Sequence, residues 1–283
     1  MSWWKAKQKQ EIDLVLSSSG VRAPCFIGGI EGILEKGYEI KRIAGTSGGA
    51  IIAAGHALGK TTEELRELAP NTPYNKFKDF SIRNLLSLTN PSVYTGQELD
   101  AFYQDVFGGA KLKDFQIDCR ISVVTIIGRE RIILDRESCP DLHVWEAVRM
   151  SSTIPFIFPY LRLDGKAVTD GGLVTDMFDI FPDDLRMKVA LRPRADHGIK
   201  KTIQDVKASK LFLWNYIKIV AEYFQDAIDN QHIPEAEWKN TLVIPTDSVG
   251  AFNFDINSED IIKLMDCGLE AVRYSEMLPD LNN

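Results

Sequence analysis

The chain has 283 residues, of which 45% are hydrophobic and 26% are charged, as in a globular protein that buries a sizeable core. Its formal net charge of -7 argues against nucleic acid or an anionic bilayer as a broad electrostatic partner. No apolar run reaches the ~20 residues that cross a bilayer, and the N-terminus lacks the apolar core of a signal peptide, so we expect a cytoplasmic protein.

The cysteines are scattered without C-x-x-C spacing, which argues against a disulfide framework or a zinc site. We expect buried free thiols at Cys25, Cys119, Cys139 and Cys267. The histidines show no H-x-x-H or H-E-x-x-H pairing, so neither a metal nor a cofactor is predicted. We expect surface or helix-face positions for His56, His143, His197 and His232.

The first sixty residues have the pattern of a strand, a loop, a helix, a second strand and a second helix. An apolar run over residues 12–16 predicts the first strand, and loop-forming residues follow over 17–20. Apolar residues at helical spacing predict a helix from the first-turn proline Pro24 to a stop at Gly37. Residues 40–44 predict the second strand.

The stretch from Gly45 to Gly49 has the pattern G-x-S-x-G, and a helix-forming run follows it to about Leu58. This pattern is typical of a nucleophile elbow, in which small residues permit a sharp strand-to-helix turn. Ser47 would project from the turn, and the helix that starts near Gly48 offers N–H groups and a dipole that favour a developing oxyanion. An ordinary tight turn is the alternative, and context has to decide.

Three helices are predicted from their first turns. The capping boxes Thr61-x-x-Glu64 and Thr95-x-x-Glu98 each place a hydroxyl and a carboxylate where a helix has unpaired donors. Near the C-terminus, Ser258 is the predicted N-cap of an amphipathic packing helix.

Two hairpins are predicted in the middle of the chain. Runs of β-branched residues over 121–127 and 131–134 flank a short turn, which predicts a hairpin at the centre or edge of a sheet. Residues 161–168 repeat that layout around an Asp-Gly turn, and the second arm ends at Asp170.

This order of elements predicts one α/β layered domain with a mixed sheet over residues 12–283, after an N-terminal tail over residues 1–11. A broad apolar helical face over residues 207–232 would pack on the core, meet a second copy or cover lipid. In the tail, the indoles of Trp3 and Trp4 beside lysines offer a peripheral membrane contact, and a disordered or locally packed terminus is the alternative.

A serine hydroxyl needs a base within hydrogen-bond reach, and Asp170 is the leading candidate for Ser47. Asp170 precedes Gly171 and Gly172, which allow the backbone to pass close to another segment. Asp-Gly-Gly alone is a common turn, but together with the elbow it indicates a catalytic pair.

The order of three motifs resembles the patatin-like phospholipase family, whose members carry a glycine-rich oxyanion loop, a G-x-S-x-G elbow and an Asp-Gly-Gly or Asp-Gly-Ala motif. Residues 16–23 stand where the family has Leu-Ser-Gly-Gly-Gly-x-Arg-Gly, and residues 43–50 and 170–172 match the other two motifs. Residues 151–159 are similar to the family's Ser-x-x-x-Pro-x-x-Phe-Pro segment. The resemblance covers residues 12–278 and implies a three-layer α/β/α patatin-like (lysophospholipase-like) fold with a mixed, mostly parallel central sheet.

The resemblance implies a lipid acyl hydrolase of the phospholipase A or lysophospholipase type that acts on phospholipids or other acyl-ester lipids. Ser47 would attack the ester carbonyl and Asp170 would take its proton, without a histidine. Because an unperturbed aspartate has a pKa of about 3.9, the site must desolvate Asp170. The implied oxyanion-hole residues are Ser18, Ser19, Gly20, Arg22 and Gly48. Arg22 would hold the loop or a phosphate, and a surface or loop-anchoring ion pair is its alternative role.

This chain departs from the family pattern in the oxyanion loop. It has Ser18-Ser19-Gly20 where relatives have three glycines, and a Cβ at each serine restricts the backbone. A catalytically impaired relative that binds lipid or protein is therefore one alternative. Milder departures are Ala23 and the residues 176–178.

A further alternative is an esterase of the α/β-hydrolase type, with a triad of Ser47, Asp170 and either His197 or His232. That fold places its elbow after several strands, whereas only two strands are predicted before Ser47.

Overall fold

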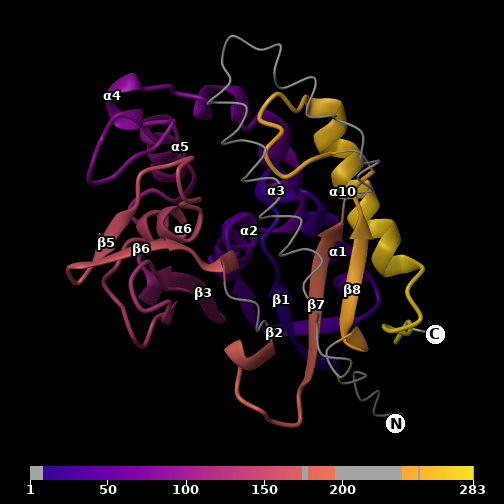
Figure 1. The fold of residues 1–283 in the computed structure, drawn as a ribbon. Coiled ribbons are helices and arrows are strands. Elements are labelled where there is room, and N and C mark those ends of the chain that lie inside the picture. Colours follow the sequence, from indigo (N-terminus) through magenta and orange to yellow (C-terminus); the bar gives the residue numbers. More distant parts are fainter. Residues whose placement is uncertain (1–8, 174–177, 195–237, 248, 283) are drawn as a thin grey trace, which may run out of the picture.

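The computed structural model describes residues 9–173, 178–194, 238–247 and 249–282. The described strands form one sheet of eight, in the order β5-β6-β3-β2-β1-β7-β8 with β4 beside β3 (Figure 1). The strands are β1 Gln10–Leu16, β2 Tyr38–Gly45, β3 Asp118–Thr125, β4 Arg131–Leu134, β5 Leu161–Leu163, β6 Lys166–Asp170, β7 Met187–Arg194 and β8 Thr241–Pro245. The α-helices are α1 Cys25–Glu35, α2 Gly48–Ala57, α3 Thr62–Leu68, α4 Ile82–Leu85, α5 Gln97–Phe107, α6 Val144–Ser151 and α10 Ser258–Arg273.

The sheet is mixed and mostly parallel. Strands β3, β2, β1, β7 and β8 run parallel to their neighbours, while β4, β5 and β6 join through antiparallel ladders. The parallel strands β1 and β2, and β2 and β3, are joined by connections that contain helices, as parallel strands require. Two of the antiparallel ladders, β3–β4 and β5–β6, are the predicted hairpins, and a third joins β3 to β6. This arrangement confirms the expected mixed sheet.

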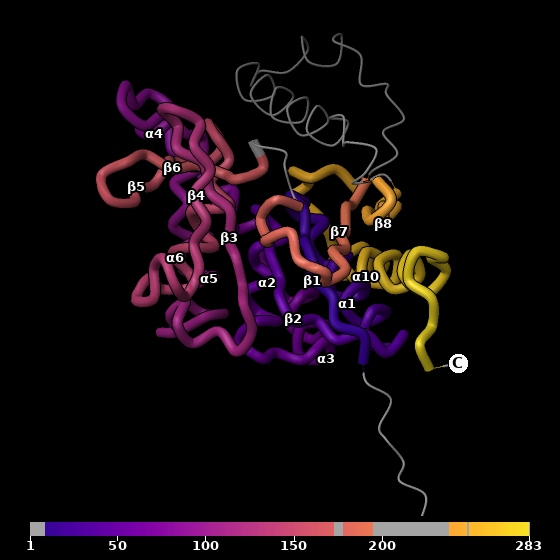
Figure 2. Tube along the Cα trace, turned by 90° about the horizontal axis from the view of Figure 1, so that it is seen from below, coloured from indigo at the N-terminus to yellow at the C-terminus, as the bar shows by residue number. Residues whose placement is uncertain are grey.

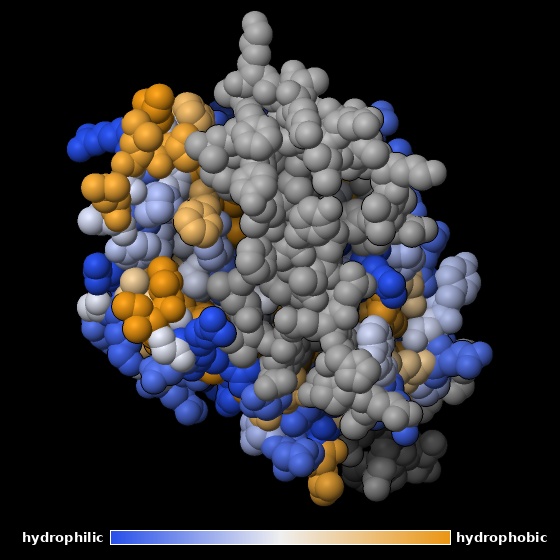
Figure 3. Space-filling view, viewed as in Figure 1, coloured by the Kyte–Doolittle hydropathy of each residue, from blue (hydrophilic) through white to orange (hydrophobic). Residues whose placement is uncertain are grey.

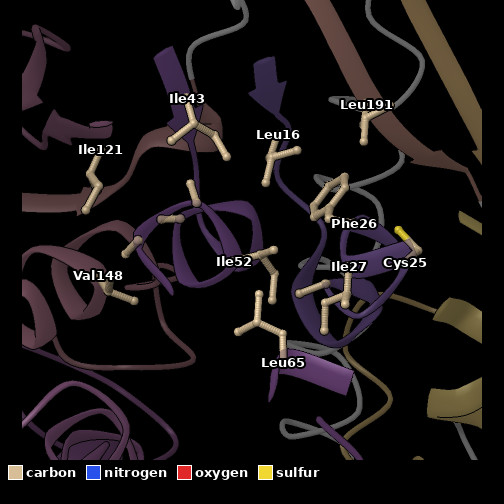
Figure 4. Packing of buried hydrophobic residues seen from close by; sticks show 14 of the residues in the cluster. Leu16, Cys25, Phe26, Ile27, Ile43, Ile52, Leu65, Ile121, Val148 and Leu191 are labelled. Atoms are coloured by element: carbon tan, nitrogen blue, oxygen red, sulfur yellow. The ribbon is translucent and has the colours of Figure 1, made fainter. Parts of the chain in front are cut away.

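The two faces of the sheet are buried by different segments. Along β1, Ile12, Leu14 and Leu16 belong to the large core, whereas Val15 belongs to a smaller cluster with Phe181. This alternation follows the two-residue period of a strand. Helices α1, α2 and α10 cover the large-core face, as the close-up of the core and the end-on view show (Figures 4 and 2).

One predicted capping box is formed, and one predicted N-cap is wrong. The Glu64 N–H donates to Thr61 Oγ1 at 3.2 Å, and the Thr61 N–H donates to the Glu64 carboxylate at 2.7 Å. Helix α10 is capped by Asn257, whose Oδ1 accepts from the Asp260 N–H at 2.9 Å, and not by Ser258. Asn257 has the extended backbone of an N-cap, whereas Ser258 is already the first helical residue.

The second predicted capping box is absent, although the helix forms. Helix α5 begins at Gln97 after Gly96, which has a left-handed backbone. The carboxylate of Asp79 accepts hydrogen bonds from the N–H groups of Thr95, Gly96 and Glu98. A carboxylate from a neighbouring segment therefore replaces the local box and stabilises the positive end of the helix.

Both predicted hairpins are confirmed, with one shift in their bounds. Strand β3 starts three residues before the predicted start and ends at Thr125, so Ile126 and Ile127 lie in an exposed turn. In the second hairpin, Asp164 and Gly165 both have positive φ, as a two-residue turn of type I′ requires.

Several predicted features lie outside the described residues: the helix over 207–232, the Trp3-Trp4 pair, His197, His232 and the pair Asp176-Met177. The cysteines are all free, but only two are buried as expected, Cys25 and Cys119, and two are half-buried, Cys139 and Cys267. In the described part of the chain, no helix has the length and hydropathy of a membrane-spanning segment.

Candidate active site

The turn between β2 and α2 has the geometry of a nucleophile elbow. Ser47 has φ 55° and ψ -125°, a backbone conformation that residues other than glycine rarely adopt. A Cβ at Gly45 would overlap the carbonyl oxygen of Gly49, and a Cβ at Gly49 would overlap that of Leu16. The backbone segments approach so closely that both positions require glycine, as the G-x-S-x-G motif of a nucleophile elbow predicts.

Strand β3 brings Asp170 to this elbow. Gly45, at the end of β2, pairs with Ile121 of β3 in a parallel ladder. Asp170, at the end of β6, pairs with Val123 of β3 in an antiparallel ladder. Because Ile121 and Val123 are two residues apart, the ends of β2 and β6 meet along the same strand.

The side chains of Ser47 and Asp170 are neighbours, and a hydrogen-bond interaction with Ser47 acts to lower the pKa of Asp170. Asp170 Oδ1 also accepts from the Gly172 N–H at 2.7 Å. Ser47 is 3% exposed and Asp170 is 5% exposed. Burial raises the pKa of Asp170 from its ordinary 3.8 to about 6, although the hydrogen bonds from Ser47 and Gly172 act to lower it. The carboxyl group is thus ionised at neutral pH and is a stronger base than an exposed aspartate.

The two glycines after Asp170 lie against other backbone segments. A Cβ at Gly171 would overlap the carbonyl oxygen of Ser122 on β3. A Cβ at Gly172 would lie 2.8 Å from Ser18 Oγ, in the loop after β1. These close approaches bring the aspartate, β3 and the loop after β1 together at one point.

The loop after β1 packs directly on the start of α2. Gly20 has φ +58°, and a Cβ there would overlap the carbonyl oxygen of Ala251. A Cβ at Gly48 would overlap Ser19 Oγ, so these two residues are in close contact. Among the described residues, no acceptor is found for the backbone N–H groups of Ser18, Ser19, Gly20 and Gly48. Buried N–H groups without a protein acceptor are the groups that an oxyanion hole needs.

Arg22 lies inside the protein, at 0% exposure, and not on the surface. Its Nε donates to the carbonyl oxygen of Ser19 at 3.1 Å, and the Arg22 N–H donates to the same oxygen at 3.2 Å. Both contacts fix the loop after β1. The side chain therefore braces the loop, which is one of the two roles expected for it.

Ser151, at the end of α6, is a further residue of the site to which sequence reasoning gave no role. The Ser47 N–H donates to Ser151 Oγ at 2.9 Å, and Ser151 Oγ donates to the carbonyl oxygen of Ser122 at 2.7 Å. Its side chain is fully buried. Ser151 therefore ties the elbow to β3, and the only sequence feature that pointed to it was the Ser-x-x-x-Pro segment over residues 151–159.

Two residues further along, Thr153 holds the strand that carries the aspartate. The carbonyl oxygen of Thr153 accepts from the Asp170 N–H at 2.9 Å and from Thr169 Oγ1 at 2.6 Å. The buried guanidinium of Arg149 donates to Thr153 Oγ1 at 2.7 Å and to Asp100 at 2.6 Å. The end of α6 thus positions the serine through Ser151 and the aspartate through Thr153.

Ser47 lies in the wall of an apolar cavity of about 480 Å³. Gly20 and Gly48 also line it, which places the unpaired N–H groups of both residues at the cavity. The apolar lining includes Ile27, Ile52, Phe77, Leu99, Phe102 and Phe158. A cavity of this kind suits an acyl chain that presents its ester to Ser47.

In the part of the chain that the structure describes, neither a histidine nor a cluster of metal ligands lies at the candidate active site. No described histidine is hydrogen-bonded to Ser47, which donates to Ser151, or to Asp170, which accepts from Gly172. His56 lies on α2, where burial lowers its pKa. The described residues hold no cluster of three or more histidine, cysteine, aspartate or glutamate side chains that would bind a metal ion.

The comparisons with known proteins cover most of the chain. The sequence model of the patatin-like phospholipase family matches residues 14–182. The uncharacterized protein YqhO of Bacillus subtilis is 30% identical over 284 residues, which span 91% of this chain and 95% of that protein. Lysophospholipase NTE1 of Coccidioides immitis is 29% identical over 176 residues, which span 59% of this chain and 10% of that protein.

Among solved structures, VipD from Legionella pneumophila is similar with a TM-score of 0.59 and 14% sequence identity. The match covers 96% of this chain and 67% of VipD. At this identity the likeness shows the fold alone. Together with the mostly parallel sheet and its flanking helices, it confirms the expected three-layer α/β/α class.

Proposed function

The chain belongs to the patatin-like phospholipase family, a family of lipid acyl hydrolases, and from this premise we propose that it hydrolyses fatty-acyl esters of phospholipids or lysophospholipids. Ser47 is the proposed nucleophile and Asp170 the proposed base. A relative that carries the name lysophospholipase supports this class of substrate.

In the proposed mechanism, Ser47 Oγ attacks the ester carbonyl carbon while Asp170 takes the hydroxyl proton. The carbonyl oxygen becomes an oxyanion, which accepts hydrogen bonds from the N–H groups of the loop after β1 and of Gly48. Asp170 then gives its proton to the leaving alcohol, and an acyl-enzyme remains on Ser47. Water, deprotonated by Asp170, attacks the acyl-enzyme; the bond between the acyl carbon and Ser47 Oγ breaks, Asp170 returns the proton to Ser47 Oγ, and the fatty acid is released.

One observation carries this proposal: Ser47 lies in the wall of an apolar cavity, beside the buried carboxylate of Asp170 and N–H groups without an acceptor among the described residues. The raised pKa of Asp170 supports its role as the base, because a carboxylate in a dry site binds the serine proton more tightly than an exposed one. The strained backbone of Ser47 supports its role as the nucleophile, since such strain concentrates at functional sites.

A catalytically impaired binding protein is the second candidate, because the loop after β1 carries two serines. The buried Oγ of Ser19 has no hydrogen-bond partner in the described part of the chain and packs against Gly48, next to the proposed oxyanion position. However, Ser19 has a negative φ of -143°, so its backbone does not take the left-handed conformation that would require glycine.

The proposal is tested by fatty-acid release from lysophosphatidylcholine and phosphatidylcholine by the purified protein. We expect hydrolysis by the wild type and its loss, by at least about 10³-fold, in Ser47→Ala and Asp170→Asn. Ser275→Ala, a serine that follows α10 far from the elbow, is the matched control and should retain full activity. A wild type that binds these lipids but releases no fatty acid would favour the binding protein.

A further inference from the structure

Exposed apolar side chains gather on and beside α4. Phe80, Ile82, Leu86, Leu88 and Phe156 have exposed fractions between 57% and 100%. We call these five side chains the α4 surface. Figure 3 shows strongly hydrophobic side chains over α4 and the loop that follows it, at the upper left of the molecule. Soluble proteins rarely expose several apolar side chains side by side, and such a group often marks a binding surface.

The fold holds the α4 surface outward through specific backbone contacts. The Val93 N–H donates to the carbonyl oxygen of Phe156 at 2.9 Å, and the Ser81 N–H donates to that of Val93 at 3.0 Å. The side chain of Asn90 binds both backbone groups of Tyr160, at 3.0 and 2.9 Å. Phe156 has φ +66°, a strained value that persists only where the surrounding structure enforces it. The segment that exposes these apolar side chains is thus held in place by several hydrogen bonds.

The charges around the α4 surface favour a lipid headgroup region. Residues 80–97 contain no aspartate or glutamate, in a chain with 40 acidic residues and a net charge of -7. Arg83 on α4 is exposed, and Lys76 and Lys78 precede the segment. In the described residues Arg83 has no acidic partner, while Lys78 is paired with Asp255. The one acid between these cations and the apolar side chains is Asp79, whose carboxylate is engaged in capping α5. Apolar side chains flanked by cations match the interface of a bilayer with phosphate headgroups.

The α4 surface and the cavity of the candidate active site are built by neighbouring residues of the chain. Phe77 lines the cavity three residues before Phe80, and Phe158 lines it two residues after Phe156. Lys76 also lines the cavity and is exposed, so the cavity reaches solvent beside this segment. The same two stretches of chain therefore form the cavity wall and the exposed apolar surface.

We propose that the α4 surface inserts into the interface of a lipid bilayer and places the cavity where an acyl chain can leave the bilayer for Ser47. The delivery of substrate rests on the proposed function, whereas the binding of the bilayer does not. Binding is therefore measured in the Ser47→Ala background, where hydrolysis cannot change the vesicles.

The test compares flotation with phosphatidylcholine vesicles, with and without phosphatidylglycerol. The parent Ser47→Ala protein should float with the vesicles. A variant that also carries Ile82→Ser, Leu86→Ser and Leu88→Ser should bind on the order of 100-fold more weakly, because three apolar side chains no longer enter the interface. Leu185→Ser is the matched control, since Leu185 is 106% exposed and belongs to the loop before β7, which lies away from α4 (Figure 1). It should bind as the parent does.

Three outcomes would overturn the proposal: a parent that does not float, a triple variant that floats as well as the parent, or a control variant that loses binding equally. The proposal would also be overturned if light scattering showed that the parent is a dimer and the triple variant a monomer, because a second copy of the chain would then cover the surface. If the triple variant does not fold, Leu88→Ser alone, at a fully exposed residue, should still weaken binding several-fold.

Discussion

Replacing Asp170 by asparagine should make the protein more stable at neutral pH while it abolishes hydrolysis. Asparagine retains the shape of the side chain, its Oδ1 accepts from the Gly172 N–H, and its Nδ2 donates to Ser47 Oγ. What the substitution removes is the buried negative charge. Because burial is the largest cause of the raised pKa, the ionised carboxylate lowers the stability of the folded protein.

The magnitude follows from the pKa. A rise from 3.8 to about 6, at ~1.36 kcal/mol per pKa unit, corresponds to about 3 kcal/mol. The folded state binds the proton more tightly than the unfolded state, so this carboxyl group costs stability as pH rises from 3.8 through about 6. We therefore expect Asp170→Asn to exceed the wild type by about 3 kcal/mol at pH 8 and by less than about 1 kcal/mol at pH 4.

The assay is urea unfolding of both proteins between pH 4 and pH 8, with the difference in free energy of unfolding plotted against pH. Asp183→Asn, which changes a fully exposed carboxylate, is the control and should show no such trend. A difference that does not change with pH, or a variant that is less stable at pH 8, would show that Asp170 is not held in a dry site.

Further predictions concern the neighbours of the pair. Ser151→Ala should lower kcat on the order of tenfold with little change in KM, because the Ser47 N–H and a carbonyl oxygen lose their partner, and steady-state kinetics on a soluble ester checks this. The kcat/KM of the wild type should rise with pH through about 6, as Asp170 loses its proton; a flat profile between pH 5 and 7 would contradict its role as the base. Alanine at His197 or His232 should leave hydrolysis intact, and a loss of three orders of magnitude would favour the triad instead. Ser19→Gly should change kcat by no more than about threefold, since Ser19 has a negative φ and does not take the left-handed conformation that glycine favours.

The elbow was predictable because its requirements are local. A serine at φ 55° and two glycines at contact distance from other backbone atoms are consequences of one sharp turn, and the spacing in the sequence records them directly. The hairpins were predictable for the same reason, since an Asp-Gly turn between β-branched runs fixes both strands.

Long-range partners were not predictable in the same way. Nothing in the local sequence says that Asp79 caps α5 or that the Ser151 hydroxyl receives the Ser47 N–H from another element. Those contacts depend on how the sheet and helices pack, and the local sequence pattern carries no information about that packing. The convergence of Ser47 and Asp170 was predicted from the order of motifs, and its physical cause, the shared strand β3, became visible only in the register of the sheet.

The most direct test of the proposed nucleophile is covalent labelling with a fluorophosphonate probe, followed by mass spectrometry of the peptides. We expect the wild type to be labelled on Ser47 alone, at a rate that falls below pH 6, and Ser47→Ala not to be labelled. An unlabelled wild type that is fully folded, or a label on another serine, would contradict the assignment of Ser47 as the nucleophile.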